Sequence, residues 1–318
     1  MDFQNPNPAV EIKQHVQRVN AEMGAMITNV EKVIKGKRNV IEEVVMSICA
    51  NGHVLLLDVP GVGKTMLAKT IAKTIASTYK RIQFTPDLLP TDITGVNIFN
   101  PKEREFEFQQ GPVFTNILLA DEINRASPKT QSALLEAMEE RQVTIDNVQY
   151  MLPKFFFVIA TQNPIEHAGT YPLPTAQLDR FMMRLSIGYP EKETELEILG
   201  VHTGTTAPLE SVQAIISEAQ ILEWQNTASS IYTSPLIDEY IVDLARATRE
   251  QGGAGVSTRA ALMLKKAARA CAVLYGRDYV IPDDVQRVIR QVFAHRISSR
   301  GKVGEAVIEE ILQKVALS

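Results

Sequence analysis

Uninterrupted apolar runs alternate with segments of helical periodicity along the first 190 residues. The apolar runs predict strands buried on both faces of a parallel sheet. The expected strands are Val54–Leu57, Arg81–Phe84, Thr115–Ala120, Phe155–Ala160 and Arg184–Ile187. The expected helices are Ala9–Ile34 (as one helix or two), Asn39–Ala50, one opened by Lys64 and Thr65, and one capped by Ser127 with Pro128 in its first turn.

The alternation stops at Tyr189-Pro190, and every later segment favours helix. The expected helices are Glu191–Leu199, Ile215–Thr227, Pro235–Thr248, Thr258–Tyr275, Pro282–Ile297 and Gly304–Val315. A change from mixed strands and helices to helices alone predicts a domain boundary. We therefore expect residues 1–190 to form an αβα sandwich with a parallel sheet, and residues 191–318 a smaller, all-helical domain.

Two segments inside the first domain predict β-hairpins. Gly95–Phe99 and Glu105–Phe108 alternate on either side of an Asn-Pro-Lys-Glu turn, and Gln142–Met151 carries Asp-Asn near its centre. Alternating segments around turn-forming residues are the usual hairpin signal.

The stretch HVLLLDVPGVGKTMLAKTIAKT, from His53 to Thr74, carries specific chemistry. An apolar strand leads into a glycine-bearing loop, and Lys64 and Thr65 open the next helix, as in a phosphate-binding loop of the Walker A kind. Glycines let backbone N–H groups surround a phosphate, which the positive end of the helix dipole also attracts. We expect Lys64 to reach the β- and γ-phosphates of a nucleotide and the Thr65 hydroxyl to bind Mg²⁺.

One residue departs from the strict motif. Asp58 stands where the first glycine of G-x-x-x-x-G-K-[ST] belongs. A carboxylate beside a polyphosphate repels it unless the side chain points away. The sequence therefore leaves two outcomes open, weakened nucleotide binding or an Asp58 side chain directed elsewhere.

Asp121 and Glu122 end the apolar run that begins at Asn116. In a parallel sheet, the carboxyl ends of the strands share one edge with the phosphate loop. We expect Asp121 to hold Mg²⁺, directly or through water, and Glu122 to orient or deprotonate the water that attacks the γ-phosphate. Charged residues often end a strand, so an Asp-Glu pair alone does not predict a magnesium site. The phosphate-binding loop upstream is what supports this assignment.

The 318 residues carry a formal net charge of −4, with 45% apolar and 22% charged residues. This composition is typical of a soluble globular protein and argues against a sequence-independent nucleic-acid binder, which usually shows a basic balance or stripe. No apolar run has bilayer-spanning length and no signal peptide is recognisable, so we expect a cytoplasmic protein. Cys49 and Cys271 lie in helical apolar patterns that predict buried thiols.

Longer motifs extend the pattern: VPGVGKT (59–65), PDLLPTDITG (86–95), GPVFTNILLADEINRASPKTQSALLEAMEERQVT (111–144), ATQNP (160–164), YPLPTAQLDRF (171–181) and GVSTRA (255–260). With these motifs the chain resembles the MoxR family of AAA+ ATPases over essentially its whole length. The resemblance implies a P-loop NTPase (AAA+) αβα sandwich followed by a helical lid, an ATPase activity, and ATP with Mg²⁺ bound between the two domains.

The resemblance also implies roles for further residues. Asn163 matches the sensor-1 residue, whose amide bonds the γ-phosphate or the attacking water. Arg180 in LDRF matches the arginine finger, which reaches the nucleotide of a neighbouring subunit, and Arg184 is its main competitor. Arg259 in GVSTRA matches sensor 2, which reaches from the lid to the nucleotide of its own chain. A solvated surface charge is the ordinary alternative for each arginine.

The nucleotide contacts that the resemblance implies fall on two segments. Val33, Ile34 and Gly36 match the segment around adenine, although core packing accounts for the two apolar residues nearly as well. The phosphate loop contributes Pro60, Gly61, Val62, Gly63, Lys64, Thr65 and Met66. His53 is favoured as a strand-opening residue over a contact to the base.

The resemblance implies a ring, most often a hexamer, because an arginine finger completes a neighbour's site. It implies a chaperone-like motor that remodels or activates a protein client, often with metal or cofactor insertion and a partner carrying a von Willebrand factor A domain. The two hairpins match insertions that project toward the ring pore, where Phe106, Phe108 or Tyr150 would grip the client.

Two other functions stay open. Asp58 could weaken catalysis and leave a nucleotide-gated binding module, although the intact Glu122 argues against this. A nucleic-acid-directed AAA+ motor is the other alternative, and the acidic balance of the chain argues against it.

Overall fold

The computed structural model describes residues 8–164, 169–202, 208–250, 255–297 and 304–315. Its centre is a five-stranded, fully parallel sheet in the order β2–β5–β8–β1–β9. The strands are β1 (Val54–Leu57), β2 (Tyr79–Gln83), β5 (Ile117–Asp121), β8 (Phe157–Gln162) and β9 (Met183–Leu185). All five predicted strands are confirmed, with ends shifted by a few residues.

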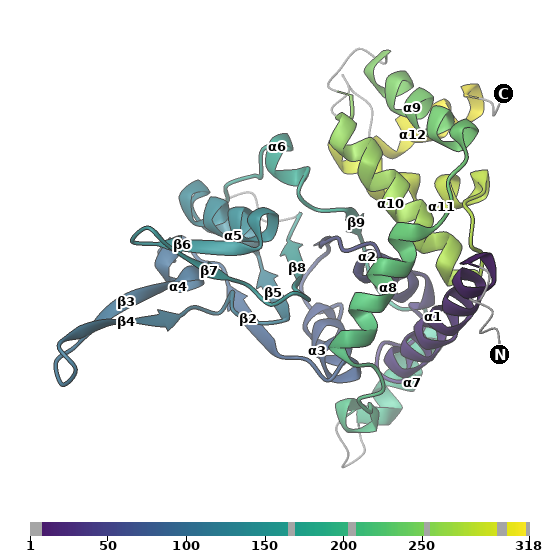
Figure 1. The fold of residues 1–318 in the computed structure, drawn as a ribbon. Coiled ribbons are helices and arrows are strands. Elements are labelled where there is room, and N and C mark those ends of the chain that lie inside the picture. The colour runs from purple at the N-terminus through teal and green to yellow at the C-terminus, as the bar shows by residue number, and fades with distance from the viewer. Residues whose placement is uncertain (1–7, 165–168, 203–207, 251–254, 298–303, 316–318) are drawn as a thin grey trace, which may run out of the picture.

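Helices cover both faces of this sheet (Figure 1). Successive strand residues face opposite sides, so Val54 and Leu56 belong to one apolar cluster and Leu55 to the other. The first cluster includes residues of α1 (Pro8–Glu31), α2 (Arg38–Cys49) and α3 (Lys64–Thr74), and the second includes residues of α4 (Pro90–Thr94) and α5 (Pro128–Glu140). The predicted αβα sandwich is therefore confirmed.

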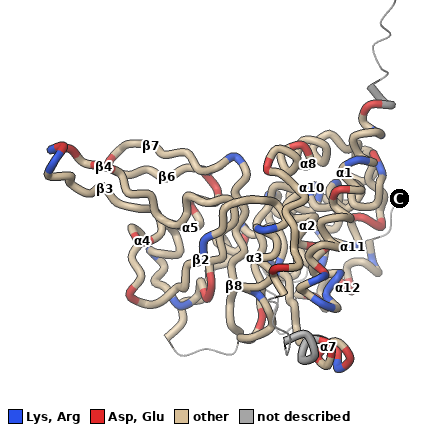
Figure 2. Tube along the Cα trace, turned by 90° about the horizontal axis from the view of Figure 1, so that it is seen from below, with Lys and Arg blue, Asp and Glu red and all other residues tan. Residues whose placement is uncertain are grey.

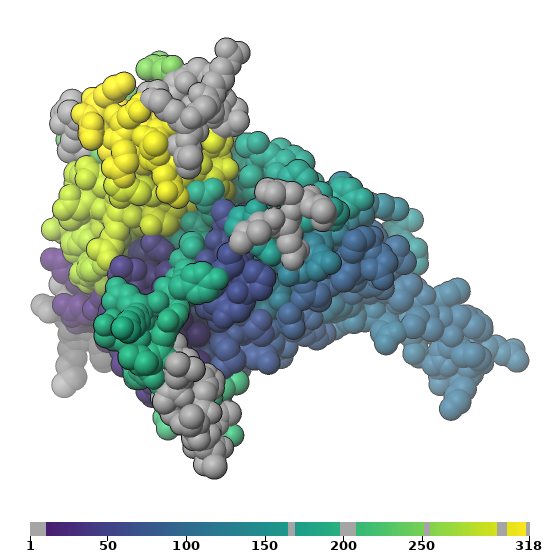
Figure 3. All heavy atoms as spheres, turned by 180° about the vertical axis from the view of Figure 1, so that it is seen from behind, coloured from purple at the N-terminus to yellow at the C-terminus, as the bar shows by residue number. Residues whose placement is uncertain are grey.

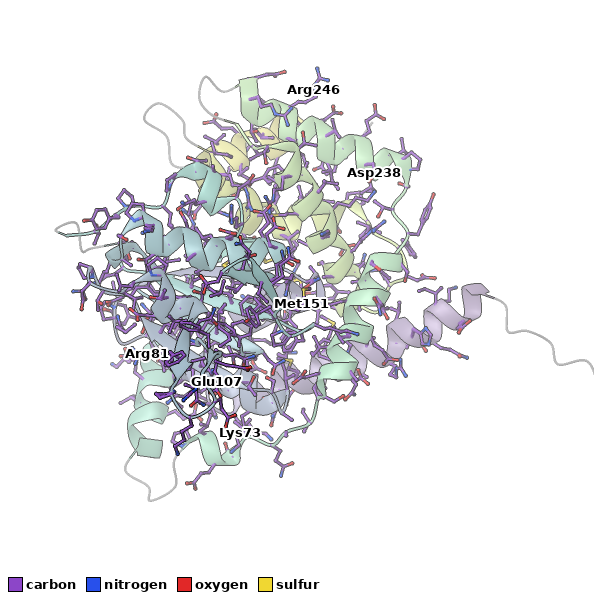
Figure 4. All side chains as sticks on the ribbon, turned by 60° about the vertical axis from the view of Figure 1, so that its left-hand side comes forward. Lys73, Arg81, Glu107, Met151, Asp238 and Arg246 are labelled. Atoms are coloured by element: carbon purple, nitrogen blue, oxygen red, sulfur yellow. The ribbon has the colours of Figure 1, made fainter. Side chains whose placement is uncertain are left out.

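Beyond β9, the described chain is helical apart from one isolated bridge between Tyr232 and Tyr279. The elements are α7 (Lys192–His202), η2 (Pro208–Ser211), α8 (Glu218–Ser230), α9 (Pro235–Glu250), α10 (Thr258–Leu274), α11 (Pro282–Phe293), η3 (Ala294–Arg296) and α12 (Gly304–Lys314). Asp238 and Arg246 mark α9, far from Arg81 and Glu107 (Figure 4). Within the described residues, no helix is both long and apolar enough to cross a membrane.

The helix α1 contacts both the sandwich and the helical region. Its Asn29 Nδ2 donates to Thr74 Oγ1 at the end of α3 (3.1 Å). Its Glu22 accepts a hydrogen bond at 2.6 Å from Nε1 of Trp224, a buried residue of α8. This N-terminal helix therefore braces the two regions against each other.

Two antiparallel hairpins confirm the hairpin predictions: β3 (Gly95–Asn100) with β4 (Glu105–Gln110), and β6 (Gln142–Ile145) with β7 (Val148–Met151). The β3–β4 hairpin projects from the body as an arm (Figures 1 and 3), with charges of both signs at its tip (Figure 2). Two rings on this arm are exposed: Phe106, which is 72% exposed, packs edge to face on Phe99, which is 49% exposed. Phe108 instead stacks on Tyr150 of the second hairpin, with ring centroids 3.9 Å apart.

Candidate functional site

The loop between β1 and α3 has the backbone of a phosphate cradle. Gly61 and Gly63 have φ of 89° and 96°, in the left-handed region that favours glycine, and a Cβ at either would meet nothing within 4 Å. Lys64, buried at the start of α3, donates from Nζ to the carbonyl oxygens of Asp58 (2.9 Å) and Val59 (3.2 Å). Open space beside the glycines and an ammonium group held against the same loop suit a polyphosphate.

The side chain of Asp58 is directed away from this loop. Its carboxylate accepts hydrogen bonds from Ser186 Oγ (2.8 Å) and from the N–H groups of Ile187 (2.7 Å) and Gly188 (3.0 Å). Asp58 is 4% exposed. The geometry therefore matches the outcome in which the Asp58 side chain is directed elsewhere. Its hydrogen bonds attach the start of the loop to the connection that leads into the helical region.

Asp121 ends β5 at the same edge of the sheet, because β5, β8 and β1 run parallel to one another. Its Oδ1 accepts a hydrogen bond from Thr161 Oγ1 (2.6 Å), and its Oδ2 pairs with Arg81 Nη2 (2.7 Å). Asp121 is buried, whereas the Arg81 side chain is 45% exposed. A metal ion at Asp121 would therefore share the carboxylate with Arg81 or displace the Arg81 guanidinium group from it.

Glu122 has an unusual backbone for a residue with a side chain. Its φ of 57° and ψ of 49° lie in the left-handed region and turn the chain from β5 into η1 (Ile123–Arg125). Its Oε2 accepts hydrogen bonds from Gln83 Nε2 (2.7 Å) and from Nη1 of Arg125 (3.0 Å). Two donors thus hold the carboxylate that is expected to orient the attacking water.

Thr161 of β8 connects the two acidic residues. Its hydroxyl donates to Asp121 and accepts from the N–H of Glu122 at 2.8 Å. Asn163 follows β8 and is buried, at the edge to which β1 and β5 also lead. Thr161 and Gln83 are candidates that the sequence pattern did not reveal, although each lies at the end of a strand that joins this edge.

A cavity of ≈540 Å³ adjoins the phosphate loop, a volume suited to a small-molecule ligand. We call it the nucleotide cavity. Six of the residues predicted to contact the nucleotide line this cavity: Val33, Ile34, Gly61, Val62, Gly63 and Met66. Ile187–Pro190, after β9, and Glu195 and Glu197 of α7 form further walls, so the cavity lies between the sandwich and the helical region. Four residues predicted to contact the nucleotide are chain neighbours of the lining but are not among the described residues that line the cavity: Gly36, Pro60, Lys64 and Thr65.

Arg180 and Arg259 lie together at a second cavity of ≈290 Å³. Arg180 follows α6 (Thr175–Leu178), and Arg259 lies in the first turn of α10. Glu139, near the end of α5, pairs with both: Oε1 is 2.7 Å from Arg259 Nη1, and Oε2 is 3.2 Å from Arg180 Nη2. We call this cavity the arginine pocket, which Arg141, Arg180, Arg259 and Lys266 line around the carboxylate of Glu139.

The two cavities have no lining residue in common among those the structure describes. Arg259 was expected at the nucleotide of its own chain, but it lies beside Arg180 and not among the residues that line the nucleotide cavity. Arg184 of β9 is outside both linings and pairs with Glu305 of α12 at 3.2 Å. The structure therefore brings together the two arginines that the motifs assigned to different roles.

His53 lines the arginine pocket from the start of β1. Its Nδ1 accepts from the N–H of Val158 (3.0 Å), and its Nε2 lies 3.4 Å from the carbonyl oxygen of Met138. Burial, assisted by the charge of Arg141, lowers the pKa of His53 to about 3, so the ring is neutral at pH 7. These contacts agree with the favoured interpretation of His53 as a strand-opening residue.

The residues at the loop also suit the magnesium ion that accompanies a nucleotide. Among the described residues, no group of three or more His, Cys, Asp or Glu side chains is arranged to hold a metal ion. Nucleotide-bound Mg²⁺ needs fewer protein ligands, because phosphate oxygens and water supply the rest. Thr65 and Asp121 are the residues predicted from the sequence to provide them.

Comparisons with known proteins agree with this geometry. Residues 53–183 match the ATPase family associated with various cellular activities (AAA), and residues 244–315 match the AAA lid domain. Chaperone MoxR1 of Mycobacterium tuberculosis is 44% identical over 308 residues, which cover 92% of this chain and 81% of that protein. The chain belongs to the MoxR family of AAA+ ATPases.

Two further similar proteins also match nearly the whole chain. The uncharacterized protein YeaC of Bacillus subtilis is 46% identical over 301 residues, covering 92% of this chain and 94% of that protein. A crystal structure from Cytophaga hutchinsonii, assigned provisionally as an ATPase, has a TM-score of 0.90 and 40% identity over 98% of this chain and 99% of that one. The family and the AAA+ fold class predicted from the sequence are confirmed, and the roles of the individual site residues stay predictions.

Proposed function

We propose that this MoxR-family chain hydrolyses ATP with Mg²⁺ and uses the reaction to remodel or activate a partner protein. The observation that carries the proposal is the meeting of the phosphate loop, Asp121, Glu122 and Asn163 at one edge of a parallel sheet. Phosphoryl transfer depends on positioning and charge stabilisation, and these are the groups that supply both.

In this proposal, each group acts through a stated atom. The loop N–H groups and Lys64 Nζ bind the phosphates, and Thr65 with Asp121 holds Mg²⁺, which neutralises charge on them. Glu122 directs its carboxylate at the attacking water after exchanging its bonds to Gln83 and Arg125 for that water. The Asn163 amide bonds the γ-phosphate or the same water.

We infer that Arg180 and Arg259 act together at the nucleotide of a neighbouring subunit. They share the carboxylate of Glu139, and the pocket they line is separate from the nucleotide cavity. Two guanidinium groups held on one small anion are prepared to bind a more highly charged polyphosphate in its place. This role requires a ring, for which family resemblance suggests a hexamer, and it assigns Arg259 to the neighbour's site rather than to its own.

The β3–β4 arm is the proposed contact to a protein client. Phe106 and Phe99 form an exposed aromatic pair there, beside the exposed Ile98. Phe108 and Tyr150 are occupied with each other and serve to hold the two hairpins together. Further proposals rest on the sequence and on resemblance alone. They are a partner with a von Willebrand factor A domain, a role in metal or cofactor insertion, a cytoplasmic location, and the domain division near Pro190.

Steady-state hydrolysis by the wild type and by a Glu122→Gln variant tests the proposal. We expect the variant to lose about 10²–10⁴-fold in turnover while ATP binding persists, because only the water-activating group is removed. Equal, negligible hydrolysis by both proteins, with ATP binding retained, would favour a nucleotide-gated binding module instead.

The ATP-bound Glu122→Gln protein also serves to retain the client, because hydrolysis no longer releases it. Adding Phe106→Ala should abolish client binding and leave ATP binding intact. The matched control is Leu236→Ala, which removes an exposed apolar side chain of α9 outside the arm. Equal client binding by these two variants would contradict the assignment of the arm.

A further inference from the structure

Arg296, in the short η3 helix after α11, is a buried arginine with no part in the chemistry described above. It is 2% exposed, and its Nε pairs with Asp179 Oδ1 at 2.6 Å. Its Nη2 donates to the carbonyl oxygen of Phe181 (2.5 Å), and its Nη1 donates to those of Met182 (3.3 Å) and Val292. Four of its bonding partners are thus spread over two separate chain segments.

Three of these partners flank one residue. Asp179 precedes Arg180, and Phe181 and Met182 follow it. A single guanidinium group therefore holds the chain on both sides of the predicted arginine finger. Arginine can do this because its N–H donors lie in one rigid plane and reach several acceptors at once, which a lysine ammonium cannot match.

The same network reaches the second arginine of the pair. The other carboxylate oxygen of Asp179 accepts a hydrogen bond from Ser257 Oγ (2.8 Å). Ser257 is the N-cap of α10, where it accepts from the N–H of Ala260, and Arg259 lies in the same first turn. Asp179 thus joins the backbone near Arg180 to the helix start that carries Arg259, while Glu139 joins their guanidinium groups.

Packing alone does not account for an arginine at this place. Burying a guanidinium group requires good hydrogen bonds to offset its desolvation, and apolar residues of similar volume often serve stability equally well or better. The donors of Arg296 are directed at the acceptors around Arg180, so its bonds determine where that loop lies relative to α11. This arrangement connects the end of α11 directly to the arginine pocket.

We propose that Arg296 is a positioning residue, which holds the chain on both sides of Arg180 and, through Asp179 and Ser257, the start of the helix that carries Arg259. The helical region then determines how the pair is presented to the nucleotide of a neighbouring subunit. The inference rests on the proposed role of Arg180 and Arg259 at that site.

The test uses Arg296→Lys in the full chain, with Arg277→Lys as the matched control. Arg277 also forms two 2.6 Å bonds to a buried carboxylate, that of Asp284, but it lies outside the lining of the arginine pocket. We expect Arg296→Lys to lower ATP turnover by about 10²-fold, the size of effect that a small misplacement produces, without changing the ATP affinity of the chain. Arg277→Lys should keep near wild-type turnover.

An experiment with mixed subunits distinguishes a positioning role of Arg296 from a role in folding. Lys64→Ala subunits lack a key phosphate contact but retain the arginine pair. In mixed rings, an Arg296→Lys subunit can receive arginines from a Lys64→Ala neighbour, so activity should recover, at about one interface in four for random mixing. Arg180→Ala mixed with Lys64→Ala should recover in the same way.

Each outcome bears on the inference. Wild-type turnover by Arg296→Lys would overturn it. So would a loss of turnover that Lys64→Ala subunits do not restore while they do restore Arg180→Ala, because Arg296 would then act within its own site or on folding. If Arg180→Ala is not restored either, the proposed shared site fails, and the inference fails with it.

Discussion

The nucleotide cavity and the arginine pocket offer different groups to a charged ligand. The first presents glycine-rich backbone and apolar side chains together with Lys32, Lys35 and Lys37, whereas the second presents guanidinium groups ordered by Glu139. Backbone N–H groups recognise a phosphate without a net charge of their own, while guanidinium groups also neutralise it. Under the proposed function, each chain carries two unlike halves of a hydrolytic site, and the halves meet only when chains meet.

The largest effect should come from Lys64→Ala, which removes the buried ammonium group of the phosphate loop and leaves the arginine pocket intact. We expect ATP hydrolysis to fall to background and nucleotide affinity to fall with it, measured by phosphate release and by calorimetry. Lys69→Ala, an exposed residue of the same helix, is the control. Unchanged ATP binding in Lys64→Ala would break the assignment of this cavity.

The next largest effect concerns the arginine pocket. Arg259→Ala should lower turnover of the assembled protein by about 10²-fold, because one charge-stabilising donor is lost. The ATP affinity of the dissociated chain, measured at a concentration where no ring forms, should not change. A reduced affinity there would place Arg259 back at its own nucleotide, as its sequence motif first suggested.

A smaller effect is expected at Asp58, which links the phosphate loop to a wall of the nucleotide cavity. Asp58→Asn should weaken ATP binding by about tenfold, because an amide accepts less strongly than a carboxylate and places an NH₂ group among N–H donors. Faster amide exchange at Ile187 and Gly188 in the nucleotide-free protein would show the cause directly. Asp243→Asn, on the exposed side of α9, should change neither quantity.

The last effect concerns stability rather than catalysis. The pKa of His53 is about 3 in the folded chain, against an ordinary value near 6.5, so the unfolded chain binds the extra proton between these values. His53 should therefore contribute a loss of about 2 kcal/mol in unfolding free energy between pH 7 and pH 5. His53→Gln, which keeps an acceptor and a donor, should remove this contribution, measured by denaturant unfolding at both pH values. Identical pH dependence in the two proteins would contradict the buried neutral ring.

What the sequence reveals depends on how local each feature is. The strand Val54–Leu57 and the loop that follows it are encoded within a dozen residues or so, and their pattern predicts both the fold class and the phosphate-binding chemistry. The acidic pair is equally local. The position of Asp121 at the same sheet edge as the loop also follows, because the carboxyl ends of parallel strands share one edge.

Other features depend on contacts between distant segments, and no local pattern contains them. Thr161 reaches both acidic residues because β8 lies between β5 and β1, a strand order that chain order does not reveal. Arg259 joins Arg180 because Ser257 bonds to Asp179, 78 positions earlier. Phe108 differs from Phe106 only because a second hairpin supplies Tyr150 to stack on it.

The N-terminal helix α1 limits how the molecule can transmit force. A helix of 24 residues is stiff, and α1 is fastened to α3 through Asn29 and to α8 through Glu22. Opening of the helical region about the connection at Pro190 would have to break one of these attachments, because they hold the two regions together at a second place. In the proposed motor, a rotation about the long axis of α1 would keep both attachments, and such a rotation, repeated around a ring, would turn a client as well as pull it.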